Sequence, residues 1–239
     1  MPLLELDHLT KSYGALVVTD DVSLTVNDGE AIGVIGPNGA GKTTLFALVT
    51  GAVPPNRGTI RLDGRDITRL PSANRCFAGV CRSHQVPQPF EKLTVFENLL
   101  VAACFGRRLS EREATPWCAE VLRETDLLSK ANRLAGSLTL LDRKRLEMAR
   151  ALATRPRLLL LDEIAGGLTE GECLELVETI KAIHARGATI VWIEHVLHAL
   201  TAIVDRLVVL NFGKLIADGP VRSVMALDAV NEIYLGSPV

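Results

Sequence analysis

The sequence predicts an α/β fold built on a mostly parallel β-sheet that helices cover on both faces. An apolar segment at 31–35 leads through a glycine-rich loop into a helix-like segment that includes Thr44. Apolar strand-like segments alternate with a helical one from residue 158 onward, which is typical of parallel sheets. A block with helical periodicity, from 94 to about 152, interrupts the strands. This block indicates an inserted helical subdomain.

The segments before the helical block predict short strands joined by turns. Residues 3–9 and 17–26 have strand character, and residues 11–14 between them have the composition of a turn. A further strand at 58–64 is bounded by glycines, and we expect it in an antiparallel sheet. Residues 84–89 contain two prolines and predict a linker.

The helical block predicts three helices. The first begins at Val95, with Thr94 as a plausible N-cap. The second spans 111–128, and the third spans 142–153 and carries the basic run Arg-Lys-Arg near its start.

The chain after the block returns to strands. The leucine run at 158–161 predicts a buried strand, and 170–186 predicts an amphipathic helix that Gly187 ends. Further strands are expected at 188–193, 206–210 and 214–217. The apolar stripe of the helix is expected to contain Leu174, Val177, Ile180 and Ile183.

Composition indicates a cytosolic globular protein. Of the 239 residues, 48% are hydrophobic, which supports a buried core. The net charge of −2 gives no general attraction to nucleic acid, so no nucleic-acid partner is expected. No signal-peptide pattern and no apolar stretch of membrane-spanning length are present, so a membrane role requires a partner. The five cysteines lack C-x-x-C pairing and are expected to be small buried hydrophobes in a reducing compartment.

The glycine-rich loop at 36–43 has the spacing of a phosphate-binding loop, G-x-x-x-x-G-K-[ST], between a strand and a helix. Its glycines let backbone N–H groups surround phosphate oxygens, and the following helix start adds donors and positive dipole. Lys42 can reach the β- and γ-phosphates, and the Thr43 hydroxyl can bind Mg²⁺. The residues expected to bind nucleotide here are Gly36, Pro37, Asn38, Gly39, Ala40, Gly41, Lys42, Thr43 and Thr44.

Two carboxylates close the leucine strand. Asp162 and Glu163 follow residues 158–161, and the carboxyl end of a buried parallel strand faces the ligand crevice. Asp162 can therefore hold Mg²⁺, directly or through water. Glu163 can accept a proton from an attacking water.

The order of these motifs resembles the ATP-binding subunit of an ABC transporter. The resemblance rests on Tyr13, the phosphate loop, Gln85, the Asp162–Glu163 pair and His195, and it spans nearly the whole chain. It implies ATP and Mg²⁺ as cofactors and a head-to-tail dimer that encloses two ATP molecules.

The same resemblance implies one ABC ATP-binding domain, 1–239, with a P-loop NTPase core. An N-terminal antiparallel β subdomain and this core are expected at about 1–86 and 156–239. The helical subdomain is expected at about 87–155.

The resemblance also implies roles for three further residues. Tyr13 corresponds to an aromatic residue that stacks on adenine. Gln85 corresponds to a glutamine that contacts Mg²⁺ and the attacking water and senses the membrane partner. His195, just past a predicted strand, corresponds to a histidine that contacts the γ-phosphate. The catalytic residues expected are Glu163, His195 and Gln85, and the metal site comprises Thr43, Gln85 and Asp162.

One segment departs from the family pattern. The family's L-S-G-G-Q signature reads Leu138-Thr139-Leu140-Leu141-Asp142 here. In the family, this segment uses backbone N–H groups to hold the γ-phosphate of the opposite subunit's ATP. The two leucines are expected to obstruct that approach, and Asp142 is expected to bring negative charge toward the phosphates. We therefore expect a dimer with a different ATP-binding subunit to hydrolyse ATP mainly at this chain's loop.

Several runs resemble the branched-chain amino acid importer subfamily, which includes urea and amide importers. They lie at 93–99, 149–154, 211–214 and 230–236. This resemblance implies two membrane subunits, a second ATP-binding subunit and, indirectly, a periplasmic solute-binding protein. It places the chain in the cytoplasm, peripheral on the inner face of the cell membrane.

Other functions remain open alternatives. A soluble ABC ATPase that acts on ribosomes or DNA typically has two cassettes or a long coiled coil, and this chain has neither. A low-turnover partner in an asymmetric heterodimer would explain Leu140 and Leu141, but Glu163 and His195 argue against it for this chain's own site. A GTPase is disfavoured because no separate N-K-x-D run is present.

Overall fold

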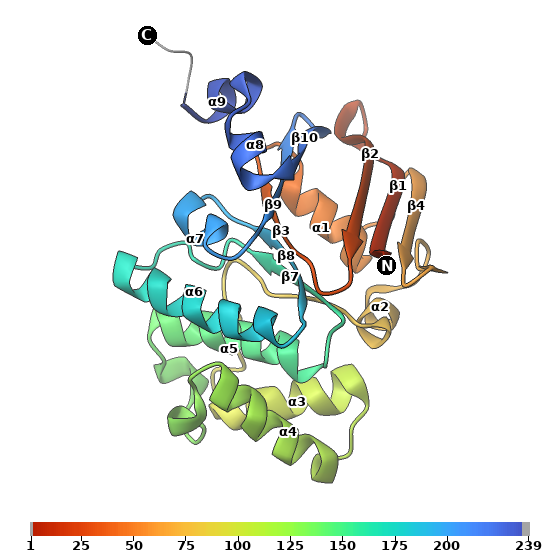
Figure 1. Cartoon of the computed structure of the whole chain (residues 1–239). Helices are drawn as coiled ribbons and strands as arrows, with labels where there is room; N and C mark the ends of the chain where they lie inside the picture. Colours follow the sequence, from red (N-terminus) through yellow and green to blue (C-terminus); the bar gives the residue numbers. More distant parts are fainter. Residues whose placement is uncertain (1, 236–239) are drawn as a thin grey trace.

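The computed structural model describes residues 2–235, which form two sheets and the helices around them (Figure 1). A four-stranded sheet has the order β2-β1-β4-β5, and a six-stranded sheet has the order β10-β9-β3-β8-β7-β6. Gly236, the last residue of the C-terminal run at 230–236, lies outside the described residues.

The four-stranded sheet is antiparallel and contains the N-terminal strands. Its members are β1 (Pro2–Tyr13), β2 (Leu16–Asn27), β4 (Arg57–Leu62) and β5 (Arg65–Asp66). The expected turn at 11–14 is wrong for its first three residues, which continue β1. Lys11 pairs with Thr19 in β2, and the Lys11 ammonium donates to the Pro54 carbonyl at 2.9 Å. The β1–β2 ladder continues to the end of β1, where Tyr13 pairs with Leu16.

The six-stranded sheet is parallel except at one edge. Its strands are β3 (Ala31–Ile35), β6 (Val80–Arg82), β7 (Leu158–Asp162), β8 (Thr189–Ile193), β9 (Arg206–Asn211) and β10 (Lys214–Pro220). β10 pairs antiparallel with β9. Every residue of β3, β7 and β8 is buried, as expected for strands that are covered on both faces.

The helices begin and end near the predicted positions in the longer elements. They are α1 (Lys42–Thr50), α2 (Ser72–Ala78), α3 (Val95–Arg107), α4 (Glu111–Glu124), α5 (Leu140–Ala153), α6 (Glu170–Ala185), α7 (Leu197–Thr201), α8 (Val221–Met225) and α9 (Asp228–Leu235), with 3₁₀ turns η1 (Leu128–Lys130) and η2 (Ala135–Ser137). Thr94 is the N-cap of α3 and forms a capping box with Glu97. The helix expected at 111–128 ends at Glu124, because Asp126 adopts left-handed backbone with φ of 55°.

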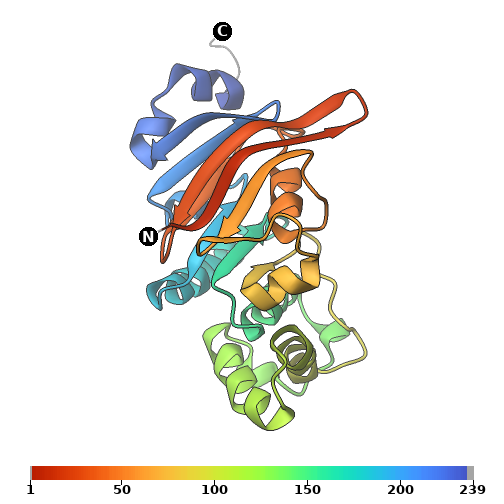
Figure 2. The same cartoon turned by 90° about the vertical axis from the view of Figure 1, so that its right-hand side faces the viewer.

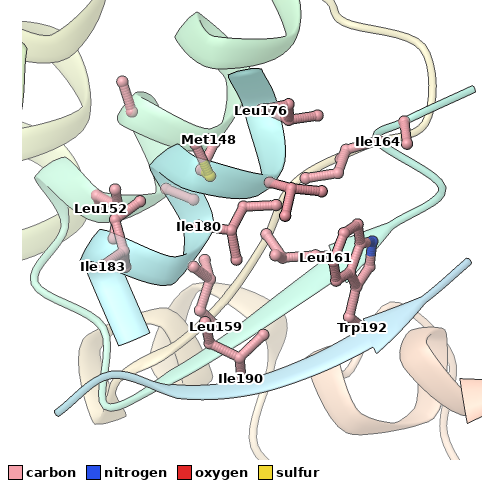
Figure 3. Close-up of a cluster of buried hydrophobic side chains, with 14 of the residues drawn as sticks. Met148, Leu152, Leu159, Leu161, Ile164, Leu176, Ile180, Ile183, Ile190 and Trp192 are labelled. Carbon is pink, nitrogen blue, oxygen red and sulfur yellow. The ribbon is translucent and has the colours of Figure 1, made fainter. Parts of the chain in front are cut away.

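Apolar side chains pack on both faces of the parallel sheet. Leu158 and Leu160 face α1 and the antiparallel sheet, whereas Leu159 and Leu161 face α5 and α6 (Figure 3). This alternation follows the two-residue period of a strand. It explains why a continuous leucine run serves two cores.

The apolar stripe of α6 differs from the expected one. Leu174 is 54% exposed, while Val177, Ile180 and Ile183 are buried together with Cys173 and Leu176. A spacing of three residues drifts around a helix with 3.6 residues per turn. Leu174 therefore lies outside the buried face of α6, which contains Val177, Ile180 and Ile183.

Helices α3 and α4 lie at one end of the molecule, away from the antiparallel sheet (Figure 2). Both pack against α5, which connects them to the parallel sheet. Within residues 2–235, no helix has the length and apolar character needed to cross a bilayer.

Candidate nucleotide-binding site

The loop at 36–43 connects β3 to α1 with little space for side chains. Gly36 and Gly41 have φ values of 155° and 101°. A Cβ atom on Gly36 would lie 2.2 Å from the Leu210 carbonyl oxygen, and one on Gly41 would lie 2.4 Å from the Val18 carbonyl oxygen. Conformation and contact both require glycine at these two positions. The backbone therefore forms a tight cradle at the start of α1.

Lys42 turns its ammonium group into this cradle. The Nζ atom donates to the carbonyl oxygens of Gly36 and Pro37 at 2.7 and 3.0 Å. Burial lowers the pKa of Lys42, while the charges of Glu163 and Asp162 act in the opposite direction. A buried cation on a glycine cradle fits a polyanionic ligand.

The three expected metal ligands line one cleft. Thr43, Gln85 and Asp162 surround a volume of about 250 Å³, together with Arg82. Thr43 and the partly buried Thr44 lie in the first turn of α1. The hydroxyl, amide and carboxylate oxygens of these three residues are of the kind that Mg²⁺ prefers.

The three expected catalytic side chains meet at one carboxylate. Glu163 Oε1 lies 2.7 Å from His195 Nε2, and Glu163 Oε2 accepts a hydrogen bond of 2.6 Å from Gln85 Nε2. The three residues follow the carboxyl ends of β7, β8 and β6, which are neighbours in the sheet. This edge of a parallel sheet is the usual place for a ligand crevice.

The backbone of Glu163 is unusual for a residue with a side chain. Its φ of 46° lies in the left-handed region. Its N–H donates to the Ile193 carbonyl at 2.8 Å, which ties it to the end of β8. Such conformations occur at functional sites because surrounding contacts hold them in place.

Arg82 is a site residue that the sequence did not indicate. Its guanidinium pairs with the carboxylate of the buried Asp162 and lies 5.6 Å from the Phe46 ring. The pairing joins residues 80 positions apart in the chain. Its only sequence signal is a cation at the end of the strand next to β7. Asp162 therefore has a cationic partner in addition to its expected metal role.

Glu194 is a second such residue, buried beside His195 with 1% exposure. Its Oε1 accepts from the Ala165 N–H at 2.8 Å, and its Oε2 accepts from the His195 N–H at 2.9 Å. Burial raises the pKa of Glu194, and these backbone hydrogen bonds partly offset the effect. One carboxylate thus connects the segments that carry Glu163 and His195.

Lys144 connects helix α5 to the same cluster. This buried ammonium donates to the Gln85 carbonyl at 2.6 Å and lies 3.5 Å from the Glu163 carbonyl. Burial lowers the pKa of Lys144, and Glu194 is the carboxylate that most opposes this shift. Movement of α5 can therefore reach both Gln85 and Glu163.

Tyr13 lies at the end of β1, where β2 returns toward the phosphate loop. Its ring is half exposed, and the Lys11 ammonium lies 5.1 Å from the ring centroid. Tyr13 pairs with Leu16, and two residues later the Val18 carbonyl approaches Gly41. The antiparallel sheet therefore presents Tyr13 beside the loop, outside the Glu163 cluster.

The family model for the ABC transporter matches residues 19–166. The chain is a member of the ABC transporter family. It is 39% identical to the branched-chain amino acid transport ATP-binding protein BraF of Pseudomonas aeruginosa, over 98% of both chains. It is 38% identical to LivG of Salmonella typhimurium, with the same description and coverage. It is also 35% identical to the lipopolysaccharide export ATP-binding protein LptB of Haemophilus influenzae, over 99% of this chain and 98% of LptB.

Solved structures agree with this family assignment. A nucleotide-free ATP-binding cassette of an ABC transporter has a TM-score of 0.90 and 30% identity over 99% of this chain and all of the other. A cassette in its ADP conformation has a TM-score of 0.91 and 31% identity with the same coverage. As an ABC transporter ATPase, the chain binds ATP and couples ATP hydrolysis to transport.

The ABC signature position corrects one expectation. Asp142 does not bring its charge toward a nucleotide, because its carboxylate is buried and accepts two hydrogen bonds of 2.7 Å from Lys130. Its N–H donates to the hydroxyl of Thr139, the N-cap of α5. Lys130 belongs to η1, so a distant element determines where Asp142 points.

The two signature leucines differ from each other. Leu141 is buried, whereas Leu140 is 43% exposed at the first position of α5. Leu140 also lies near the segment after Glu163, since a Cβ added to Gly167 would lie 3.4 Å from its Cδ2. Of the two, only Leu140 presents an apolar side chain at the outer end of the helix.

Proposed function

We propose that this chain is the ATP-hydrolysing subunit of an importer for branched-chain amino acids or a related small polar solute. The supporting observation is its similarity to BraF and LivG, which are 39% and 38% identical along nearly the whole chain. Both are described as high-affinity branched-chain amino acid transport ATP-binding proteins.

The proposed nucleotide site uses the residues expected from the sequence. Residues 36–44 bind the phosphates, Tyr13 stacks on adenine, and Lys42 neutralises phosphate charge. Mg²⁺ would be held by Thr43 and Gln85 and, directly or through water, by Asp162. When bound, the ion supplies charge neutralisation at the phosphoryl oxygens.

The catalytic step would depend on how Glu163 is released. Both of its carboxylate oxygens are engaged, one by His195 and one by Gln85. Each oxygen keeps a free lone pair, but a water can approach Glu163 more closely and transfer a proton more readily when one of these contacts opens. His195 and Gln85 would then turn to the γ-phosphate and Mg²⁺. This exchange of partners would make hydrolysis dependent on bound nucleotide.

The proposed assembly follows from the transporter role. A head-to-tail dimer with a second ATP-binding subunit, or a second copy, would enclose two nucleotides. Two membrane subunits would contact the region near Gln85 and the helical subdomain at about 87–155. A periplasmic solute-binding protein would act indirectly, with this chain on the cytoplasmic face of the membrane.

Lipid export is a second candidate. It is favoured by the 35% identity to LptB, a protein of the lipopolysaccharide export system, over 99% of this chain. The nucleotide chemistry would be the same in both cases. The two proposals differ in the molecule that stimulates turnover.

The test is reconstitution of the chain in lipid vesicles with the membrane, binding and ATP-binding proteins of adjacent reading frames. We expect leucine, isoleucine or valine, with the binding protein, to stimulate Mg²⁺-dependent ATP hydrolysis. A matched assembly with Glu163→Gln should give no stimulation. Stimulation of ATP hydrolysis by lipopolysaccharide alone would favour lipid export over import as the function of this chain. No magnesium-dependent nucleotide binding at all would contradict both.

A further inference from the structure

Two of the five cysteines lie side by side, which their spacing did not suggest. Cys81, Cys118 and Cys173 are buried as expected, but Cys76 and Cys104 are only half-buried. Cys76 is in α2 and Cys81 is in β6, and their Sγ atoms are 3.6 Å apart. Gly79 between them has a φ of 105°, and this left-handed turn brings the helix end and the strand together.

Both thiols line a cavity of about 390 Å³ between α1, α2, α3, β6 and the C-terminal half of α5. Cys76 is the more accessible of the two, whereas Cys81 is buried behind it. Arg82 and Arg150 also line this cavity. A small polar reagent that enters the cavity would therefore meet Cys76 first and Cys81 next.

Their surroundings give the two thiols different reactivity. The hydrogen bond from Cys81 lowers the pKa of Cys76 to about 7, with a smaller contribution from Arg107. The same hydrogen bond and burial raise the pKa of Cys81. Cys81 Sγ also lies 2.7 Å from Thr154 Oγ1. Cys76 can therefore react as a thiolate near neutral pH, and the Cys81 thiol lies within reach of its sulfur.

We propose that Cys76 and Cys81 form a reversible disulfide site that reacts with small two-electron oxidants such as hydrogen peroxide. The Cys76 thiolate attacks one peroxide oxygen, the O–O bond breaks, and hydroxide leaves, which gives a sulfenic acid on Cys76. Cys81 then attacks that sulfur, and its proton goes to the departing hydroxide. Two thiols lose two electrons and two protons, and one peroxide becomes two waters.

Disulfide formation would reach the nucleotide site through β6. The sulfur atoms must approach from 3.6 Å to a bond of about 2.0 Å. Cys81 directly precedes Arg82, whose guanidinium pairs with Asp162. Movement of Cys81 would displace the Arg82–Asp162 ion pair and break the contact between Cys81 and Thr154. Misplacement by roughly 1 Å can slow an enzyme up to about a hundredfold, so we expect ATP turnover to fall about tenfold.

Mass spectrometry can identify this disulfide directly. Trypsin cleaves after Arg75 and Arg82, so one peptide, 76–82, contains both cysteines and no other. The full chain is treated with hydrogen peroxide, alkylated and digested. We expect this peptide to be unalkylated and two hydrogens lighter, and to return to the dithiol form with dithiothreitol. The rate should rise between pH 6 and 8.

Two variants and a turnover assay complete the test. Cys76→Ser should abolish the peroxide effect on ATP turnover, whereas Cys104→Ser, a half-buried thiol elsewhere, should retain it. The proposal is overturned if both thiols of peptide 76–82 remain alkylatable or if either pairs with another cysteine. It is also overturned if the disulfide forms fully while turnover is unchanged. Because the peptide is read in the wild-type chain, a variant that fails to fold leaves the test decisive.

Discussion

The loops after β6, β7 and β8 differ sharply from the N-terminal end of α5, although family resemblance assigns both to nucleotide contacts. In the loops, the side chains of Gln85 and His195 converge on Glu163. At the end of α5, the exposed side chain is Leu140, and the Asp142 carboxylate points inward to Lys130. The two regions therefore differ in chemistry, because polar side chains converge in the loops whereas an apolar side chain is exposed at the start of α5.

The largest effect on nucleotide affinity is expected when the phosphate loop loses its cation. Lys42→Ala removes a charge-assisted contact worth about 1.5–3 kcal/mol, so ATP affinity should fall roughly 10- to 100-fold. Equilibrium binding of a fluorescent ATP analogue measures this change. Lys214→Ala, which removes an exposed ion pair with Asp20, serves as the control. Equal ATP affinity in Lys42→Ala and wild type would contradict the proposal that the phosphate loop and its lysine bind the nucleotide.

Glu194→Gln tests whether one buried carboxylate holds together the loops that carry Glu163 and His195. Gln keeps one acceptor but opposes a backbone N–H with its amide, so unfolding free energy should fall by about 1–3 kcal/mol. Burial raises the wild-type pKa of Glu194, so the folded state binds a proton more readily than the unfolded state. Wild-type stability from this group is therefore lost as pH rises through the folded-state pKa.

Urea unfolding at several pH values measures both effects of Glu194→Gln. The variant lacks this titration, so the stability difference from wild type should narrow as pH rises. A stability difference that widens as pH rises would mean that the backbone hydrogen bonds lower the pKa of Glu194 more than burial raises it.

Leu140→Gly tests whether the exposed leucine at the start of α5 limits turnover at the partner's nucleotide. Removing the exposed side chain restores backbone access at the helix start, and we expect turnover at the partner's nucleotide to rise about tenfold, near 1.4 kcal/mol. Single-site turnover is measured with this chain's own site disabled by Glu163→Gln. Leu174→Gly, an exposed leucine on α6, is the matched control. No increase would indicate that the leucine does not limit the partner site.

Thr94→Ala gives the smallest expected effect and tests the helical region. Loss of the N-cap of α3 should lower the unfolding free energy by about 1 kcal/mol. Thr115→Ala, on the exposed surface of α4, is the control. Thermal unfolding measures the change, and ATP turnover should stay near wild type. A large loss of ATP turnover would mean that the capping box of α3 also positions residues of the nucleotide site.

Local signals predicted the core of the fold. Strand 31–35 and its loop were predicted where the structure places them, because glycine spacing and apolar runs determine local backbone. The turn at 11–14 was partly wrong because sheet pairing extends β1 to Tyr13. The short helices α2, α7 and α8 have at most seven residues, too few for a periodic pattern to be visible.

Long-range pairing limited the prediction of the site. Strand-end position was enough to bring Glu163 and His195 together, since neighbouring parallel strands end at one edge. Arg82, Lys144 and Glu194 were missed because their roles depend on partners from other elements. Asp142 was misplaced for the same reason, since Lys130 lies on a separate 3₁₀ turn.

The most direct test of the central claim assigns turnover to one site of the assembled dimer. Glu163→Gln in this chain and the corresponding Glu→Gln in its ATP-binding partner are compared in separate complexes. We expect the change at Glu163 to reduce ATP turnover by roughly 10²–10⁴-fold, while nucleotide still binds. The partner's change should leave most turnover intact. Full turnover with Glu163→Gln and its loss with the partner's change would contradict the account.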